Sequence, residues 1–333
     1  MIWLTWRQFR AQTVAAAGLL AVLAIAFAVT GPQLVHLYDT TVAPCHVQHD
    51  CPFAVGTFQS QDSFLQDLVR LVMLAAPALI GIFWGAPLIA HELEAGTQRL
   101  AWMQSVTRFR WLAVKLSLAG LASMAAAGLL SLMVTWWFSP LDRVGPGGRL
   151  DPGVFSDRGI VPVGYAAFAL ALGVTAGLLI HRTVPAMVVT LAVFAAVETV
   201  FALRVRFHLI PPVRLESALN MHWVTETGTG GPAGRGSFLV GITPNLPGAW
   251  LGSSKVTTAV GSPALGRTPS ACGQASSYNA CTAAISRMHL RQVLVYQPAS
   301  RFWAFQWYET AIYFALALVL AGFCVWWVRR RVS

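Results

Sequence analysis

The chain has 333 residues, of which 56% are hydrophobic and only 11% are charged. A soluble globular protein carries about 25% charged residues, so this composition excludes an ordinary soluble domain and indicates that much of the surface faces lipid. The net charge of +10 does not indicate a nucleic-acid partner, because the basic residues are spread among apolar segments. It is typical of loops that orient membrane spans.

Six apolar segments are long enough to cross a hydrocarbon core of about 30 Å, which takes about 20 helical residues. None shows the two-residue alternation of a barrel strand, and only helices otherwise satisfy their own backbone groups in lipid. We therefore predict an all-α integral membrane fold. The predicted spans are residues 12–30, 69–90, 113–138, 160–180, 184–203 and 305–328.

The first segment follows Arg7 and Arg10 and ends near Ala26-Phe27-Ala28, as a signal peptide does. Its apolar run is longer than the apolar core of most signal peptides, so we expect it to be retained as a span.

Short loops give the orientation. The predicted loop 31–68 contains no Arg or Lys, whereas bases gather before the first span, in the loop 91–111 and after the last span. We therefore place both termini in the cytoplasm and the long segment 204–304 outside. The predicted divisions are the first five spans with their cytoplasmic loop (1–203), the extracytoplasmic segment (204–304), and the sixth span with its basic tail (305–333).

Four cysteines fall in the predicted outer loops: Cys45, Cys51, Cys272 and Cys281. Disulfides persist in an oxidising compartment, so we predict two of them, and pairing within each loop is the simplest of three connectivities. His46 and His49 stand between the first two cysteines and make a metal site the alternative there. We favour the disulfide and predict no metal.

The segment 204–304 is rich in Gly, Pro, Ser and Thr, which indicates irregular structure. Its end, Tyr278 to Tyr296, has apolar residues at helical spacing. We predict one or two short helices there, leading back to the membrane.

The loop between spans two and three carries acids first and bases after them. Thr97 is placed to cap a short helix and Gly96 to supply a turn. Four apolar residues after them would give that helix one hydrophobic face: Leu100, Trp102, Met103 and Val106. Such a helix either docks a soluble partner or anchors the loop at the membrane surface, and the residues leave both open.

Glu92-Leu93-Glu94-Ala95-Gly96-Thr97 is followed by Val106-Thr107-Arg108. This pattern resembles the coupling segment of type-2 ATP-binding cassette exporter permeases, with Ser105 where members often have Pro. The segments 3–10 and 296–306 resemble an actinobacterial subgroup.

The resemblance implies coupling to an ATPase through six residues, which are Glu92, Glu94, Gly96, Thr97, Arg99 and Arg108. It implies a dimer of permease chains, homomeric or heteromeric, in a bacterial plasma membrane, with ATP and Mg on separate ATPase subunits. It also implies export, for example of drugs or antibiotics, although the residues do not name the cargo.

No P-loop surrounds Lys115 or Lys255, the two lysines of the chain. We therefore predict no catalytic residues and no cofactor on this chain. The enzyme alternative is an intramembrane protease, but Ala95 replaces the second His of a His-Glu-x-x-His motif that His91 would begin. A non-transporting signalling or immunity protein of the same shape is the other alternative.

Within the spans, Pro77, Pro87 and Glu198 are candidates for the translocation path. The prolines would kink span two, as a moving part or a static bend. Glu198 would contact substrate or a proton, pair with Arg204 or Arg206, or lie near the outer interface. Arg70 and Glu309, near span ends, are expected to extend toward the interface.

Overall fold

The computed structural model describes residues 2–44, 56–58, 60, 63–94, 107–143, 148–220, 224–230, 237–242, 246, 248–257 and 278–330. The chain divides into two compact units. One, here called the helical unit, comprises Met1–Val144, Pro152–Arg206 and Trp303–Ser333. The other, called the sheet unit, comprises Gly145–Asp151 and Phe207–Phe302. The predicted division had assigned no part of 139–159 to the second region.

Six helical stretches among the described residues are long and apolar enough to cross a membrane, which confirms the six predicted spans. They are Thr13–Val42, Ser63–Glu94, Phe109–Trp137, Val161–Ile180, Thr183–His208 and Ala299–Arg330. Several run beyond the predicted bounds. The fifth in particular continues past residue 203 as a π-helix η6 (Phe201–Val205) and a 3₁₀ turn η7 (Arg206–His208).

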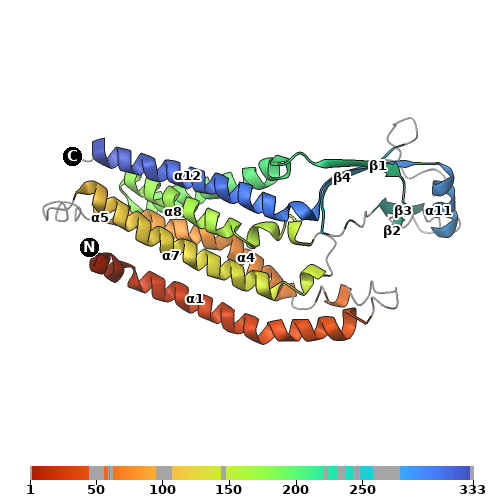
Figure 1. Ribbon diagram of the computed structural model, residues 1–333, viewed down its shortest axis with the longest axis horizontal. Helices are drawn as coiled ribbons and strands as arrows, with labels where there is room; N and C mark the ends of the chain where they lie inside the picture. The colour runs from red at the N-terminus through yellow and green to blue at the C-terminus, as the bar shows by residue number, and fades with distance from the viewer. Residues whose placement is uncertain are drawn as a thin grey trace. The chain divides into compact units, whose positions relative to one another are not determined.

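The spans are built from the following helices (Figure 1). The first is α1 (Ile2–Leu37) with the π-helix η1 (Tyr38–Val42), and the second is α4 (Ser63–Leu79), the π-helix η2 (Ile80–Gly85) and α5 (Ala86–Glu94). The others are α7 (Arg108–Trp137), α8 (Val161–Ile180), α9 (Thr183–Val200) and α12 (Phe302–Arg330). Short 3₁₀ turns lie at η3 (Leu141–Arg143), η4 (Gly148–Leu150), η5 (Phe155–Asp157) and η9 (Ala299–Arg301).

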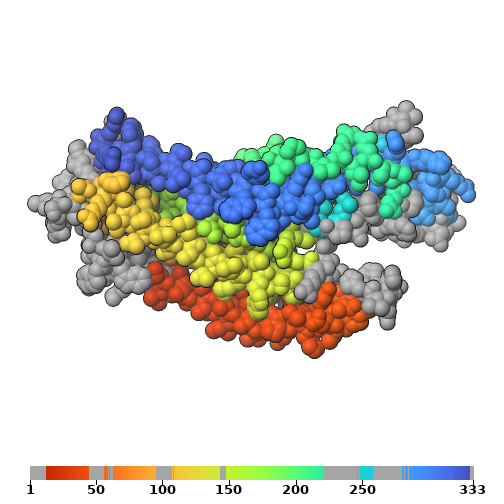
Figure 2. Space-filling view, viewed as in Figure 1, coloured from red at the N-terminus to blue at the C-terminus, as the bar shows by residue number. Residues whose placement is uncertain are grey.

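Helix α8 forms the centre of the helical unit, since most of its residues are buried and it packs against η2, α5, α7 and α9. It is apolar on all sides, as a helix surrounded by other helices must be. The outer helices expose large apolar side chains, for example Leu71 and Leu318, as lipid-facing helices do. Helix α1 forms one edge and lies against α7 (Figure 2).

Glycines allow the second span to approach α8 closely. A Cβ on Gly173 would lie 2.3 Å from the carbonyl oxygen of Gly81, and one on Gly177 would lie 2.5 Å from that of Ala86. Gly81 and Gly85 form one small-xxx-small pair, and Gly173 and Gly177 form the facing one. Such pairs bring backbones together in membranes. The close contact falls on η2, so the widened π-turn is fixed against the central helix.

The two ends of the chain lie at one end of the helical unit, together with the end of α5 (Figure 1). The guanidinium carbon of Arg329 lies 4.9 Å from the centre of the Phe109 ring, which joins the end of α12 to the start of α7. We call this the termini end, and the other the opposite end.

The sheet unit corrects the all-α prediction. Its three-stranded antiparallel sheet has the order β1 (Val213–Ala218), β5 (Arg291–Gln297) and β4 (Trp250–Thr257). A separate antiparallel pair joins β2 (Val224–Gly230) to β3 (Ser237–Ile242). Segment 204–304 is therefore not simply irregular, because its short strands pair across long stretches of sequence.

The stretch Tyr278 to Tyr296 is only half helical. Helix α11 ends at Arg287 (Tyr278–Arg287), and a turn at Met288 and His289 leads into strand β5, with His289 at a left-handed φ of 47°. One short helix is therefore present where one or two were predicted, and the rest of the stretch is a strand because Val293, Val295 and Tyr296 favour an extended backbone. In the sheet, Leu294 is fully buried.

Candidate functional site

Glu94 links the second span to the fifth at the termini end. It is the last residue of α5, and its Oε2 accepts hydrogen bonds from the backbone N–H of Thr183 at 3.1 Å and from the Thr183 hydroxyl at 2.8 Å. Thr183 is the first residue of α9, where backbone N–H groups are unpaired and the helix dipole favours an anion. Glu94 therefore caps a helix of a different span.

Glu92 makes the corresponding link to the third span. Its carboxylate forms an ion pair with Lys115 of α7, whose Nζ also lies 3.5 Å from the Leu88 carbonyl oxygen. Lys115 is buried, so the pair is shielded from solvent more than a surface ion pair is. The second span is thus tied to its two neighbours within three residues of sequence.

The remaining predicted coupling residues are only partly described. Gly96, Thr97 and Arg99 lie outside the described residues, as does the proposed short helix. Arg108 is the first residue of α7. The cap of α7 is Thr107, whose side chain accepts from the Arg110 backbone N–H at 3.3 Å.

Pro77 and Pro87 lie on either side of the π-helix η2. Pro77 is inside α4 and Pro87 is the second residue of α5. A proline removes one backbone donor, and a π-turn is one way in which a helix absorbs such an interruption. The predicted irregularity of span two is therefore a widened turn, and Gly81 and Gly85 within it contact α8.

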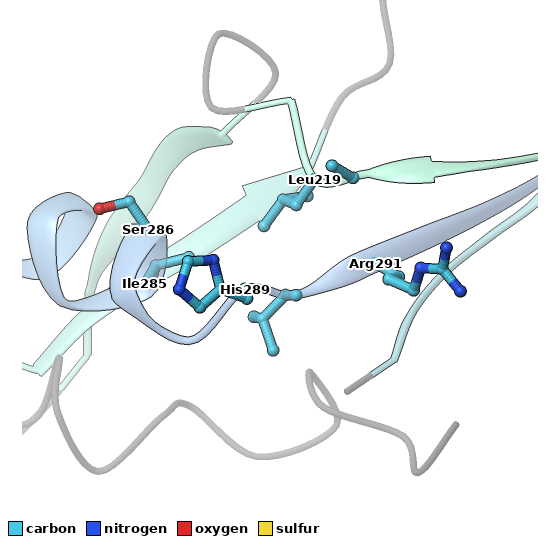
Figure 3. Close-up of a pocket in the computed structure, with 7 residues that line it drawn as sticks. Leu219, Ile285, Ser286, His289 and Arg291 are labelled. Atoms are coloured by element: carbon cyan, nitrogen blue, oxygen red, sulfur yellow. The ribbon is translucent and has the colours of Figure 1, made fainter. Parts of the chain in front are cut away.

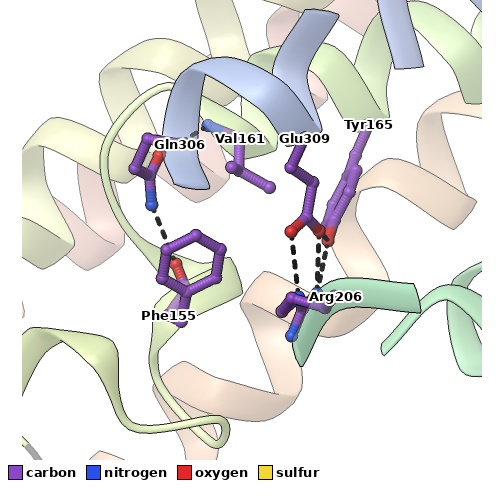
Figure 4. Close-up of polar contacts among 6 residues, drawn as sticks. All are labelled: Phe155, Val161, Tyr165, Arg206, Gln306 and Glu309. Carbon is purple, nitrogen blue, oxygen red and sulfur yellow. Dashed lines mark hydrogen bonds and ion pairs between the residues drawn. The ribbon is translucent and has the colours of Figure 1, made fainter. Parts of the chain in front are cut away.

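A buried ion pair joins three spans at the opposite end (Figure 4). Arg206, in η7, donates from Nε to Glu309 Oε2 at 2.9 Å and from Nη2 to Oε1 at 2.8 Å. Its Nη2 also donates to the Tyr165 hydroxyl oxygen at 2.8 Å, and that hydroxyl donates to Glu309. The side chains of Arg206 and Glu309 are 3% and 0% exposed.

This pair corrects the expectation that Glu309 extends to the interface. A bidentate arginine–carboxylate pair is the strongest common ionic contact, and burial makes either partner costly to remove. The signal that sequence reasoning missed is the pair Gln306 and Glu309, which are one turn apart on one face of an apolar helix.

Gln306 uses that position to cap α8. Its Oε1 accepts from the backbone N–H groups of Ile160 and Val161 at 2.9 and 3.1 Å, and its Nε2 donates to the Phe155 carbonyl at 3.2 Å (Figure 4). Gly159 has a φ of 70°, and a Cβ there would lie 2.6 Å from Gln306 Oε1. Helix α12 thus holds the start of the central helix.

Two charged residues of the connection between α7 and α8 are buried beside this network. Arg158 pairs with Asp142 and its guanidinium lies 4.6 Å from the Phe138 ring centre. Asp157 is 7% exposed, and burial raises its pKa to about 6 although Arg158, Arg70 and Arg206 act in the opposite direction.

Glu198 is partly buried on α9 and makes no hydrogen bond or ion pair with any described residue. Of the two partners that the pairing alternative named, Arg206 is bound to Glu309 and Tyr165 instead, and Arg204 forms no ion pair with Glu198. Glu198 and Arg206 still interact electrostatically.

An apolar cavity of about 590 Å³ opens between α1, α4 and α7 in the helical unit. Its walls include Leu19, Leu23, Leu79, Trp84 and Leu130. Side chains of this kind suit an aliphatic or aromatic ligand and offer no group for acid–base chemistry.

The sheet unit has a smaller pocket of about 240 Å³ at the end of α11 (Figure 3). Ser286 and His289 both line it, which raises the question of a nucleophile and its base. Among the described hydrogen bonds of this pocket, however, the Ser286 hydroxyl donates to the Ala283 carbonyl oxygen at 2.9 Å. The pocket thus lacks the contact that would activate Ser286.

The predicted disulfides stay predictions. Cys45, Cys51 and Cys272 lie outside the described residues, and Cys281 lies in α11. Cys324 is a buried free thiol in α12, 3.2 Å from the Thr175 hydroxyl.

The chain matches a known protein family. The model of the family described as "ABC-2 membrane transporter related" matches residues 17–206, which is more than half of the chain and includes α4, α5, α7, α8 and α9. Searches of the curated proteins and of the solved structures return no match. With six apolar spans and this match, the chain belongs to the ABC-2 membrane transporter related family: it is a multi-pass membrane protein with a permease-like role, and the family implies partnership with an ABC ATPase.

Proposed function

We propose that this chain is the permease subunit of an ATP-driven exporter in a bacterial plasma membrane, acting as a dimer with separate ATPase subunits. The sequence has no P-loop, so ATP and Mg would bind to the partner, and this chain would carry no catalytic residues. Its work would be mechanical, because it would convert closure of the ATPases into movement of its spans.

The observation that carries this proposal is the contact between Glu94 and Thr183. The loop 91–111 leaves the second span at Glu94, and the same carboxylate holds the start of α9. A movement of this loop would therefore displace the fifth span directly as well as the second. The ion pair of Glu92 and Lys115 would transmit the same movement to the third span.

The fifth span is also held at its other end. Arg206 follows η6 and is bound to Glu309 of α12 and Tyr165 of α8. A displacement of α9 would strain the ion pair of Arg206 and Glu309. The pair would therefore hold the outer ends of the spans together until ATP binds. A π-helix next to a functional contact is a frequent arrangement, and η6 provides it here.

The orientation rests on charge and on the shared end of the termini. The described bases Arg110, Lys115, Arg329 and Arg330 lie at the termini end, which we assign to the cytoplasm. The sheet unit would then be extracytoplasmic, where Cys272 and Cys281 would meet an oxidising environment.

Site-specific photo-crosslinking tests the coupling role. A photoreactive residue at Thr97 is expected to cross-link to an ATPase subunit in native membranes, and one at Asn220 in the sheet unit is not. Cross-links from both positions, or from neither, would contradict the assignment of loop 91–111 as the ATPase contact.

A further inference from the structure

A pocket of about 440 Å³ opens between α1 and α7 at the opposite end of the helical unit. The first and third spans both end near it, the first with η1 and the third at Trp137. The pocket therefore lies where the hydrocarbon core of the membrane gives way to water. It is separate from the apolar cavity between α1, α4 and α7, because no described residue lines both.

Two tryptophans of α7 form one side of this pocket. The side chain of Trp137 is 1% exposed, donates from Nε1 to the Thr30 hydroxyl at 2.8 Å and stacks on Phe27 with ring centres 5.4 Å apart. Gly31 lets the Trp136 ring lie close to α1, since a Cβ on this glycine would be 2.9 Å from it. Contacts within the chain thus hold this side of the pocket in place.

Asp39 brings an unpaired carboxylate to the pocket. It lines the pocket from η1, is exposed, and forms no hydrogen bond or ion pair with a described residue. Among the described residues that line the pocket, none is Arg or Lys, and the segment 31–68 contains four Asp and neither base. The charge at this pocket is therefore negative and favours a cation.

The backbone that carries Asp39 is irregular. Residues Tyr38–Val42 form the π-helix η1, and single π-turns are frequent at functional sites. The hydroxyls of Thr40 and Thr41 donate to the carbonyl oxygens of His36 and Leu37 at 2.8 and 2.6 Å. Neither hydroxyl therefore donates to Asp39, and its carboxylate remains available to a ligand.

The other lining groups suit a cation that carries N–H donors. The Trp136 side chain is 56% exposed and pairs with no other described ring or cation, and an open indole face attracts cations. His36 and Ser139 also line the pocket, and a neutral ring nitrogen and a hydroxyl oxygen both accept N–H donors. A metal ion suits the pocket less, since no group of three or more His, Cys, Asp or Glu side chains among the described residues could hold one.

We infer that this pocket binds a primary ammonium group, with Asp39 as its counter-charge and the Trp136 ring against it. A phospholipid with an ethanolamine headgroup and a soluble primary amine both carry this group, and a pocket at the ends of two spans is open to either. The site goes beyond the proposed transport role, because binding needs neither an ATPase nor ATP.

Native mass spectrometry of the full chain in detergent, with phosphatidylethanolamine or phosphatidylglycerol added, tests the inference. Phosphatidylglycerol is the matched lipid that lacks the ammonium. We expect Asp39→Asn to weaken binding of phosphatidylethanolamine about tenfold and to leave binding of phosphatidylglycerol unchanged. Asp67→Asn is the matched control, because it alters an exposed acid that pairs with Arg70 and does not line the pocket, so it should bind both lipids as the wild type does.

Soluble O-phosphoethanolamine distinguishes the two sources of the ammonium. Displacement of the bound phosphatidylethanolamine by this compound would show that the headgroup alone binds, as a soluble amine would. Retention of the lipid in its presence, together with the loss in Asp39→Asn, would show that the ligand is the whole phospholipid. Both results support an ammonium site at Asp39.

Trp136 provides a second pair of variants. Trp136→Phe retains an aromatic face and should keep most of the binding of phosphatidylethanolamine, whereas Trp136→Leu should lose it severalfold. Unchanged binding of phosphatidylethanolamine in Asp39→Asn, or an equal fall for both lipids, would overturn the inference, and so would equal binding in the two Trp136 variants. None of these measurements involves an ATPase, so failure here is distinguishable from failure of the permease proposal.

Discussion

Glu94 ends one span and caps another: its Oε2 lies 2.8 Å from the hydroxyl oxygen and 3.1 Å from the backbone nitrogen of Thr183. The sequence-based hypothesis gave Glu94 a contact with the ATPase, whereas the structure gives it a partner within the chain. The predicted role in ATPase coupling and the observed contact with Thr183 agree if Glu94 transmits movement of the loop to α9.

Removing this contact from either side should have the same effect. Glu94→Ala and Thr183→Val are each expected to leave ATP hydrolysis by the assembled transporter largely intact and to lower transport per ATP hydrolysed severalfold. Thr183→Ser, which retains the hydroxyl, is the control. The measurement is ATPase rate and cargo flux in the same proteoliposomes, and a double variant no worse than either single one would show a shared pathway.

The ion pair of Arg206 and Glu309 should dominate the stability of the helical unit at its opposite end. Glu309→Gln leaves a buried guanidinium without its counter-charge, so we expect the free energy of unfolding to fall by about 3–5 kcal/mol. Replacing the exposed Glu216, which pairs with Arg214 at 2.7 Å, should change it by less than about 1 kcal/mol. Denaturant unfolding in detergent measures the free energy of unfolding of both variants. Similar losses in the two would show that the buried ion pair stabilises the chain no more than the exposed one does.

The contact between η2 and α8 predicts a strong position effect for one substitution. Gly173→Ala places a methyl group 2.3 Å from the Gly81 carbonyl oxygen, so it should destabilise the chain by about 1–3 kcal/mol. Gly322→Ala is the matched change, because nothing lies within 4 Å of a Cβ there. It should be neutral or stabilise α12 by up to about 1 kcal/mol. Thermal unfolding of the two variants compares them directly.

Asp157 predicts a pH dependence of stability. Its folded pKa of about 6 exceeds the ordinary 3.8, so the folded state retains a proton that the unfolded state has lost between these values. Stability should therefore fall as pH rises from about 4 to about 6, by up to about 3 kcal/mol, and then level off. The positive charges of Arg158, Arg70 and Arg206 favour the ionised form of this carboxyl and so oppose the effect of burial. Glu198 is an acid that interacts electrostatically with Asp157.

Asp157→Asn should remove this component of the pH profile and raise stability at pH 7 relative to the wild type. Unfolding curves of both proteins at pH 4.5 and pH 7 give the difference. An unchanged pH profile in the variant would show that Asp157 is ionised in the folded protein at both pH values.

The spans were predictable because membrane insertion depends on local composition. Each of the six segments carries its own signal, so α8 and α9 are found without knowledge of any partner. The end of the fifth span was misplaced at residue 203 because Arg206 reads as a flanking charge. Only its partner Glu309, 103 residues further along the chain, makes it part of the span.

The sheet was not predictable for a related reason. Val213 pairs with Tyr296 and Trp250 with Gln297, so each short strand depends on residues far away in sequence. Glycine and serine around these strands hide the alternation. At the termini end, Glu92 and Glu94 were recognised as important, but their partners Lys115 and Thr183 lie on other spans and became apparent only in the fold.

The most direct test of the permease proposal is a pull-down from native membranes with a tag after Ser333, followed by identification of the bound chains and an assay of ATP hydrolysis. The proposal predicts that a P-loop ATPase is recovered in stoichiometric amount and that the recovered material hydrolyses ATP in the presence of Mg. This ATP hydrolysis should be lost from the recovered material when the loop 95–106 is replaced by a Gly/Ser linker. A well-folded preparation that recovers no ATPase would contradict it and favour a non-transporting role for this fold.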